Sequence, residues 1–261
     1  MHYVRAGSGT PPLVFVHGFC CSHEDWLPQI NRLKSRFEAV ACDLRGHGQT
    51  PGRPQDVSIE HFGGDVAALI ANLDLPKAIL VGHSMGCRVV LEAARVAPDS
   101  VAGLVLIDGS QQGSGDPAAA ESSARAFIDS KGWDAFASGL FGQMFLQESD
   151  LSRAIVARAR RVPAENGIAL WPRMARWDAT YVEKVLSGLR VPLLAIQTTY
   201  LNPERKRLSL KAGESSPWLD TVRRQVPDAR IEVLPGLGHF PQLEAADAVN
   251  RLISGFAAGG R

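Results

Sequence analysis

The sequence predicts an α/β fold: a doubly wound, mostly parallel sheet with a helical cap inserted between two late strands. Short β-branched or apolar runs alternate with longer segments of helical period, which is typical of a parallel sheet covered by helices on both faces. One interval, residues 109–191, is far longer than the usual connection in such a fold. We therefore expect a core of residues 1–110 and 188–261 and a cap of residues 111–187.

The strands are predicted from apolar runs that are too short for helices. Residues 3–6 are expected to form an edge strand that precedes the buried ones. The buried strands are expected at residues 13–17, 39–43, 78–82, 101–108, 192–197 and 230–234.

Helices are predicted where apolar residues recur at helical spacing behind a suitable first residue. Ser22 and Ser58 are candidate N-caps, and further helices should follow Ser84, Ser216 and the proline at 241. The cap should contain helical segments at residues 118–131, 133–147, 151–162 and 167–177.

Composition limits the kind of partner. Lys and Arg number 28 against 27 Asp and Glu, so the net charge of +1 provides no field for a nucleic acid or a membrane surface. No apolar run approaches the roughly 20 residues of a membrane span, and no signal segment is apparent. We expect a cytoplasmic protein, monomeric or homodimeric, that acts on a small molecule.

Cofactor and metal motifs are not found in the sequence. The four cysteines, at positions 20, 21, 42 and 87, lack disulfide or zinc spacing and are expected to be reduced. We predict no metal and no cofactor. Two basic clusters are interpreted as solvated faces, one at positions 153, 158, 160 and 161 and the other at Arg205, Lys206, Arg207 and Lys211.

The strongest chemical signal is the segment from Gly82 to Gly86, which reads Gly-His-Ser-Met-Gly. It lies directly after a predicted strand and before a predicted helix, the context in which a G-x-S-x-G pattern forms a nucleophile elbow. Such a sharp turn needs small residues at both ends, and it lifts the serine hydroxyl above the carboxyl edge of the sheet. Ser84 is therefore the predicted nucleophile.

Together with three further motifs, this elbow resembles the α/β-hydrolase superfamily over nearly the whole chain apart from the cap. The other motifs are His-Gly-Phe at 17–19, Asp-Leu-Arg-Gly-His-Gly at 43–48 and Gly-His-Phe at 238–240. The resemblance implies that the backbone N–H groups of Phe19 and Met85 form an oxyanion hole. It also implies that His239 is the general base, because the base of this fold follows the last strand. His17, Asp43, Arg45 and His47 are interpreted as residues that brace loops.

The triad acid departs from the commonest pattern of the superfamily, which places an Asp after the strand at 192–197. Residues 198–204 contain no Asp. In certain haloalkane dehalogenases the carboxylate instead closes the preceding strand, and Asp108 matches that position. Asp108 is the predicted acid, Glu204 is the alternative, and Asp220 and Asp228 are more remote candidates.

The predicted function is cleavage of a carboxylic ester, lactone or thioester through an acyl-enzyme on Ser84. A neutral base is needed, so the rate should fall on the acid side with an apparent pKa near or somewhat below 7. An apolar acyl or aryl substrate is favoured by aromatic residues that could line the pocket, namely Phe141, Phe145, Trp171, Trp177 and Phe240. The alternatives are C–C bond hydrolysis, lyase or cofactor-free oxygenase chemistry, and a non-catalytic ligand receptor. Haloalkane dehalogenases and epoxide hydrolases of this fold need an Asp in place of Ser84.

Overall fold

A computed structural model describes residues 1–202, 204 and 206–259. Its central sheet has seven strands in the order β1-β3-β2-β4-β5-β6-β9. Only β1 runs antiparallel to its neighbour; every other pairing is parallel. The strands are β1 (Tyr3–Ala6), β2 (Leu13–Val16), β3 (Ala39–Cys42), β4 (Ala78–His83), β5 (Val101–Ile107), β6 (Leu193–Gln197) and β9 (Arg230–Val233).

The predicted strands are confirmed, with ends that differ by one residue at most. Every residue of β2, β3 and β4 is buried, which explains why these segments read as unbroken apolar runs. A feature that the sequence did not predict follows β6: a small hairpin formed by β7 (Thr199–Leu201) and β8 (Arg207–Ser209).

Helices cover both faces of the sheet, and each face has its own apolar cluster. One face is covered by α1 (Leu27–Leu33) and α10 (Ala246–Ala257), which contribute Ile30 and Ile253 to the core. The other is covered by α2 (Ile59–Asn72), α3 (Met85–Val96) and α8 (Pro217–Gln225). Shorter turns are η1 (His23–Trp26), η2 (Pro54–Asp56), η3 (Pro98–Ser100) and α9 (Pro241–Glu244).

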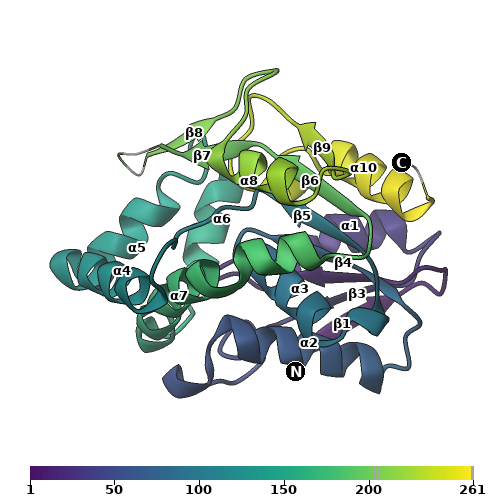
Figure 1. The fold of residues 1–261 in the computed structure, drawn as a ribbon, viewed down its shortest axis with the longest axis horizontal. Coiled ribbons are helices and arrows are strands. Elements are labelled where there is room, and N and C mark those ends of the chain that lie inside the picture. The colour runs from purple at the N-terminus through teal and green to yellow at the C-terminus, as the bar shows by residue number, and fades with distance from the viewer. Residues whose placement is uncertain (203, 205, 260–261) are drawn as a thin grey trace.

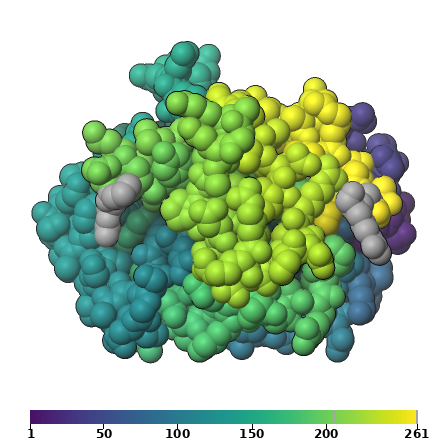
Figure 2. Space-filling model, turned by 45° about the horizontal axis from the view of Figure 1, so that its top comes forward, coloured from purple at the N-terminus to yellow at the C-terminus, as the bar shows by residue number. Residues whose placement is uncertain are grey.

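Four helices lie between β5 and β6 in the described chain, within the interval predicted to be a cap. They are α4 (Pro117–Lys131), α5 (Trp133–Phe141), α6 (Asp150–Ala159) and α7 (Ala164–Gly188). Figure 1 shows α4, α5 and α6 gathered on the side of the molecule away from α10. In Figure 2 this teal region and the yellow C-terminal helix flank the light green segment that follows β6.

Residues 111–187 are called the cap below, after the predicted role. Two of the helices in this region differ most in length from the prediction. The first, α5, ends at Phe141 and does not reach residue 147, because a glycine follows at 142 and disfavours continuation. The second, α7, runs through Pro172 as far as Gly188. A proline inside a helix costs about 3 kcal/mol, but the buried face of α7 continues beyond it through Val182 and Leu186, and this packing offsets the cost.

Candidate active site

Ser84 occupies a strained turn between β4 and α3. Its φ of 55° and ψ of −114° lie in a region that L-residues rarely adopt, and its N–H is held by the carbonyl of Ile107 at 2.9 Å. A Cβ on Gly82 would lie 2.3 Å from the Gly86 carbonyl oxygen, and one on Gly86 would lie 2.3 Å from the Val16 carbonyl oxygen. Glycine at position 82 therefore lets the two arms of the turn approach each other, as the sequence predicted, and glycine at position 86 lets the turn lie against β2.

Three of the predicted residues meet at the carboxyl edge of the sheet. The Oγ atom of Ser84 lies 2.8 Å from Nε2 of His239, and Nδ1 of His239 lies 2.5 Å from Oδ2 of Asp108. Ser84 follows β4, Asp108 follows β5 and His239 precedes α9, so segments far apart in the sequence supply them. This chain of contacts can carry a proton from the serine to the imidazole while the carboxylate holds the ring.

Asp108 is held by a cradle of donors. Its Oδ1 accepts hydrogen bonds from the backbone N–H groups of Thr198 and Thr199 at 2.9 and 2.7 Å, and its Oδ2 accepts the Thr199 hydroxyl at 2.5 Å. Burial alone raises the pKa of Asp108, but His239, Arg207 and Thr199 outweigh burial and lower it to about 2. The carboxylate is therefore ionised at neutral pH. Asp108 also has a positive φ of 44°, which turns the chain out of β5.

The structure brings Asp108 to His239 and leaves the alternative acids elsewhere. Glu204 lies exposed in the turn between β7 and β8. Asp220 lies on α8, where it pairs with Arg223, and Asp228 is exposed in the loop before β9.

The loop that carries His239 is fixed on three sides. Its backbone N–H donates to the carbonyl of Met144 in the cap at 2.7 Å, and its carbonyl lies 2.7 Å from Nε2 of His83. The Glu244 carboxylate accepts the N–H groups of Gly238 and Phe240 at 3.0 and 3.1 Å. The imidazole is therefore held in place from its backbone as well as through Asp108.

His239 is 2% exposed, and its pKa is lowered to about 4. Burial is the main cause because it disfavours the charged ring; the positive charge of Arg207 adds to this effect, and Asp108 opposes it. The residue type alone predicts a value near or somewhat below 7. The structure corrects this expectation downward, because burial and a nearby cation are not visible in the sequence around His239.

Arg207 is the residue of this site that the sequence analysis missed. We interpreted it as part of a solvated basic cluster, but its side chain is only 7% exposed and lies against Asp108 and His239. The prediction is wrong because the β7–β8 hairpin turns the side chain of Arg207 inward. No local sequence pattern predicted this hairpin. Of the same cluster, Lys206 and Lys211 are exposed, and Arg205 lies outside the described residues.

The two residues predicted to form an oxyanion hole lie close to Ser84: Met85 follows it in the chain, and Phe19 follows Gly18, where a Cβ would lie 3.2 Å from Cβ of Ser84. Phe19 is 4% exposed and lies in the loop after β2, whereas Met85 is the first residue of α3. Among the described residues, the N–H of Phe19 has no protein acceptor, and the N–H of Met85 has none outside its own helix. A first helical residue also has no acceptor within its helix.

The bracing roles predicted for the polar loop residues are confirmed. The His17 ring lies 2.8 Å from the Gly18 carbonyl oxygen and accepts the Leu44 N–H at 3.1 Å, which ties two loops together. Asp43 accepts the backbone N–H groups of His23 and Gln49 at 2.7 and 2.9 Å. Arg45 pairs with an aspartate of α2, and His47 contacts the Arg45 carbonyl. None of these residues touches Ser84 or His239.

His23 is buried beside the same carboxylate. It is 7% exposed and bonds to Asp43, because its loop folds over the end of β3. Nδ1 of His2 bonds to the second carboxylate oxygen of Asp43 at 2.9 Å. The donor atoms of this trio lie within 4.8 Å of one another, a spacing that could hold a metal ion. Each of these donor atoms already takes part in a hydrogen bond, and these bonds explain the cluster. The backbone also packs closely here, because a Cβ on Gly48 would lie only 2.4 Å from either Asp43 oxygen.

The aromatic residues predicted to line the pocket lie in four places. Trp171 packs edge-on against Phe19, with ring centroids 5.4 Å apart, and Phe145 stacks on Phe240 at 5.1 Å, next to His239. Phe141 lines a cavity of about 420 Å³ formed by cap residues. Trp177 is fully buried and donates to Glu92 of α3 at 3.0 Å, so it joins the cap to the core away from the serine.

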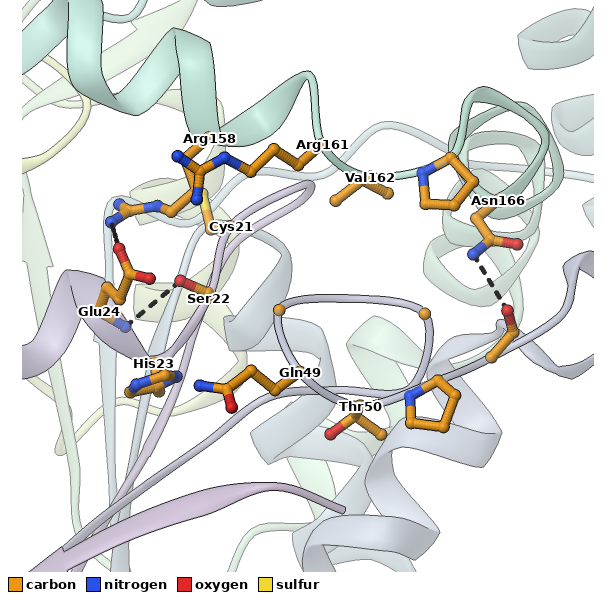
Figure 3. Close-up of a pocket in the computed structure, with 15 residues that line it drawn as sticks. Cys21, Ser22, His23, Glu24, Gln49, Thr50, Arg158, Arg161, Val162 and Asn166 are labelled. Atoms are coloured by element: carbon orange, nitrogen blue, oxygen red, sulfur yellow. Dashed lines mark hydrogen bonds and ion pairs between the residues drawn. The ribbon is translucent and has the colours of Figure 1, made fainter.

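A larger cavity, of about 520 Å³, lies between the cap and two core loops. Figure 3 shows Arg158 and Arg161 of the cap on one side, with Gln49 and Thr50 of the core opposite. Arg158 also bonds to Glu24 at 2.8 Å and pairs with the buried Asp25, which is a further departure from the solvated face predicted for it. Neither Ser84 nor His239 lines this cavity.

Comparisons with known proteins agree with the fold. Residues 13–252 match the model of the alpha/beta hydrolase family, so the chain belongs to that family. The solved structure of a thermophilic esterase from Thermogutta terrifontis has a TM-score of 0.81 at 24% identity, covering 99% of this chain and 93% of that one. The enol-lactonase from Burkholderia xenovorans has a TM-score of 0.74 at 23% identity, covering 98% and 96%. These likenesses confirm the predicted fold.

Two curated relatives match nearly the whole chain. The 2-(acetamidomethylene)succinate hydrolase of Mesorhizobium japonicum is 28% identical over 97% of this chain and 90% of its own length. A dihydrolipoyllysine-residue acetyltransferase component of the acetoin cleaving system from Pseudomonas putida is 29% identical over 96% of this chain, which spans only 64% of that protein. Family membership indicates a hydrolase that acts on small molecules. Among the described residues, no helix has the length and apolar character needed to cross a membrane.

Proposed function

We propose that this protein is a serine hydrolase that cleaves a carboxylic ester, a lactone or a thioester through an acyl-enzyme on Ser84. The observation that carries the proposal is the contact chain from the Ser84 hydroxyl through His239 to Asp108, at 2.8 and 2.5 Å. A receptor that had lost catalysis would have no reason to keep a strained serine in contact with a buried base.

The chemistry follows from the positions of these groups. Nε2 of neutral His239 takes the Ser84 proton while Oγ attacks the acyl carbon, and Asp108 stabilises the imidazolium that forms. The N–H groups of Phe19 and Met85 are suited to hold the tetrahedral oxyanion, and losing one such donor typically costs about 3 kcal/mol of barrier. The imidazolium then returns the proton to the leaving alcohol. Water, activated by the same imidazole, releases the acid and regenerates Ser84.

The substrate we propose has an apolar acyl or aryl group. This is supported by the aromatic side chains around the serine loop: Phe19 contacts Trp171 and Trp133, with ring centroids 5.4 and 6.2 Å apart. Flat or aliphatic groups bury well against such rings.

The decisive experiment is a hydrolysis panel of p-nitrophenyl esters of increasing chain length, lactones and thioesters, with Ser84→Ala as the control. We expect turnover by the wild type and none by the variant. A fluorophosphonate probe tests the serine without any assumption about the substrate, and it should label the wild type only. A wild-type protein that neither labels nor turns over any member of the panel would refute the proposal.

A second candidate is hydrolysis of an amide-type substrate. It is favoured by the relative from M. japonicum, which is named a 2-(acetamidomethylene)succinate hydrolase and aligns with 97% of this chain. That compound belongs in the same panel, and a preference for it over all the esters would establish this second reading.

A further inference from the structure

The β7–β8 hairpin places the guanidinium of Arg207 beside the contacts that join Ser84, His239 and Asp108. Nη1 of Arg207, on β8, lies 2.7 Å from the Thr199 hydroxyl oxygen, 3.0 Å from Nδ1 of His239 and 3.5 Å from Oδ2 of Asp108. The side chain is 7% exposed. Burying a guanidinium costs several kcal/mol unless it is paired. Its surroundings therefore have to compensate for its charge, and the only carboxylate it touches among the described residues is Asp108.

The hydrogen bonds of this corner have a defined direction. Arg207 has only donors, so it donates to the Thr199 oxygen, and the Thr199 hydroxyl then donates to Asp108. The backbone of Arg207 is anchored as well, since its N–H donates to the side chain of Gln143 in the cap at 3.0 Å. The guanidinium is thus held from both ends and cannot swing out to solvent without breaking these bonds.

The contact between Arg207 and Nδ1 distinguishes the two tautomers of His239. If Nδ1 carried no proton, it could accept from Arg207, but Nε2 would then be protonated and could not take the proton of Ser84. The productive tautomer has its proton on Nδ1 and donates it to Asp108, which lies closer, at 2.5 Å. In that tautomer Arg207 is a positive charge beside an N–H group. It opposes the addition of a second proton to the ring.

Other ionisable groups face His239 from each element packed around it. Asp108 follows β5 and favours the protonated ring. His83, at the end of β4, has its ring centroid 4.8 Å from that of His239, and burial keeps its pKa well below the usual value, so it is neutral. Glu244 of α9 binds the backbone on both sides of His239, and burial raises its pKa. Arg207 is the one cation in this set.

We propose that Arg207 is a positioning residue, which fixes Thr199 and Asp108 through its hydrogen bonds and keeps His239 unprotonated, and therefore active as a base, in acidic solution. The inference rests on the proposed function for the role of His239 as a base. The effect of Arg207 on the charge of the ring is independent of the substrate.

The test compares Arg207→Met and Arg207→Gln with Arg207→Lys, which keeps the charge but not the planar fork. Lys206→Met is the matched control, because it removes an exposed cation from the same hairpin. Protonation of His239 is followed by NMR of histidine labelled with ¹³C at Cε1, with His239→Gln to assign the signal. The acid limb of kcat/KM is measured on the best ester of the panel.

Loss of the cation should raise the pH at which His239 is half protonated by about one unit, the usual effect of a charge within 4–6 Å. The acid limb of kcat/KM should move upward equally in the Met and Gln variants. It should stay near the wild-type position in Arg207→Lys and in Lys206→Met. If Arg207 had only a structural role, its replacement would lower kcat/KM at every pH without changing the midpoint pH of the acid limb.

An identical His239 titration in the wild type and in Arg207→Gln would overturn the inference. If neither neutral variant folds, the wild-type titration still decides: a ring that is half protonated at pH 6.5 or above would contradict the role of Arg207. The NMR measurement needs no turnover, so it separates failure of this inference from failure of the proposed hydrolase activity. The latter would appear as absence of fluorophosphonate labelling.

Discussion

Arg88 and Asp178 form a bidentate ion pair between the helix that follows the nucleophile and the longest helix of the cap. Nε and Nη2 of Arg88, on α3, lie 2.8 and 2.7 Å from the two oxygens of Asp178, on α7. Both side chains are buried, with 2% and 0% exposed. Asp178 also accepts the N–H of Gln112 at 2.6 Å, which joins the first cap segment to the same point.

Removing one member of this pair should destabilise the protein strongly. Asp178→Ala leaves a buried guanidinium without its partner, and we expect a loss of about 3–5 kcal/mol in the free energy of unfolding. The measurement is urea denaturation followed by tryptophan fluorescence. Asp150→Ala is the control, because Asp150 is fully exposed in its pair with Arg153 and should change stability by less than about 0.5 kcal/mol. A similar loss in both variants would show that the pair has no special role.

Ser84→Ala should abolish hydrolysis while leaving the fold intact, because Ala fits the turn and only the attacking oxygen is lost. Circular dichroism and the initial rates of the ester panel check the two parts. Ser187→Ala, at an exposed position on α7, should retain full activity. Substantial turnover by Ser84→Ala would displace Ser84 as the nucleophile.

Asp108→Asn should reduce kcat by about 10⁴-fold, because the amide can neither fix the productive tautomer nor stabilise the imidazolium. Glu204→Gln should leave kcat unchanged, since Glu204 is exposed in the hairpin turn. Steady-state kinetics of both variants on one ester decide between them. The opposite pattern, with a large loss only at residue 204, would reverse the assignment of the acid.

The wild-type rate should remain high well below neutral pH. Catalysis needs neutral His239, and its pKa is lowered to about 4, first by burial and next by Arg207. We therefore expect kcat/KM to be nearly constant from pH 7 down to about pH 5 and to fall below that. A pH profile in mixed buffers of constant ionic strength measures this. A midpoint of the acid limb at pH 6 or above would contradict it.

Protein stability should also fall on acidification, because several histidines are buried in the neutral form. Burial lowers the pKa of His17 to about 3 and that of His47 to about 4. The unfolded chain binds protons at these residues below about pH 6.5, whereas the folded protein binds them only near pH 3–4. The unfolded state therefore gains protons first, and stability decreases as the pH falls through this window. Each histidine should contribute on the order of 1–2 kcal/mol at pH 5. Urea midpoints that do not differ between pH 7 and pH 5 would refute this.

The sequence was most informative where chemistry and backbone geometry coincide. The Gly-x-Ser-x-Gly segment predicted both a turn and a nucleophile, and its glycines at positions 82 and 86 leave room for the turn and for its contact with β2. Asp108 was predicted in another way, from the resemblance to family members whose carboxylate closes this strand. For the elbow, a short local pattern contained the physical cause.

The features that were missed depend on contacts between distant segments. Arg207 looks solvated in its own segment, and only the folding of the hairpin buries it. Trp177 was named for the pocket, yet its indole reaches Glu92, 85 positions earlier in the chain. Periodicity predicts which face of a helix is buried, but it does not specify the side chains that the face meets.

The backbone N–H of His239 donates to the carbonyl of Met144, so the loop that carries the base is tied to the cap loop around residue 144. Were that loop to swing outward to admit a molecule, it would pull the imidazole off the serine. Opening at this corner would therefore break the contact between His239 and Ser84. While that contact is intact, a substrate has to reach Ser84 by another route.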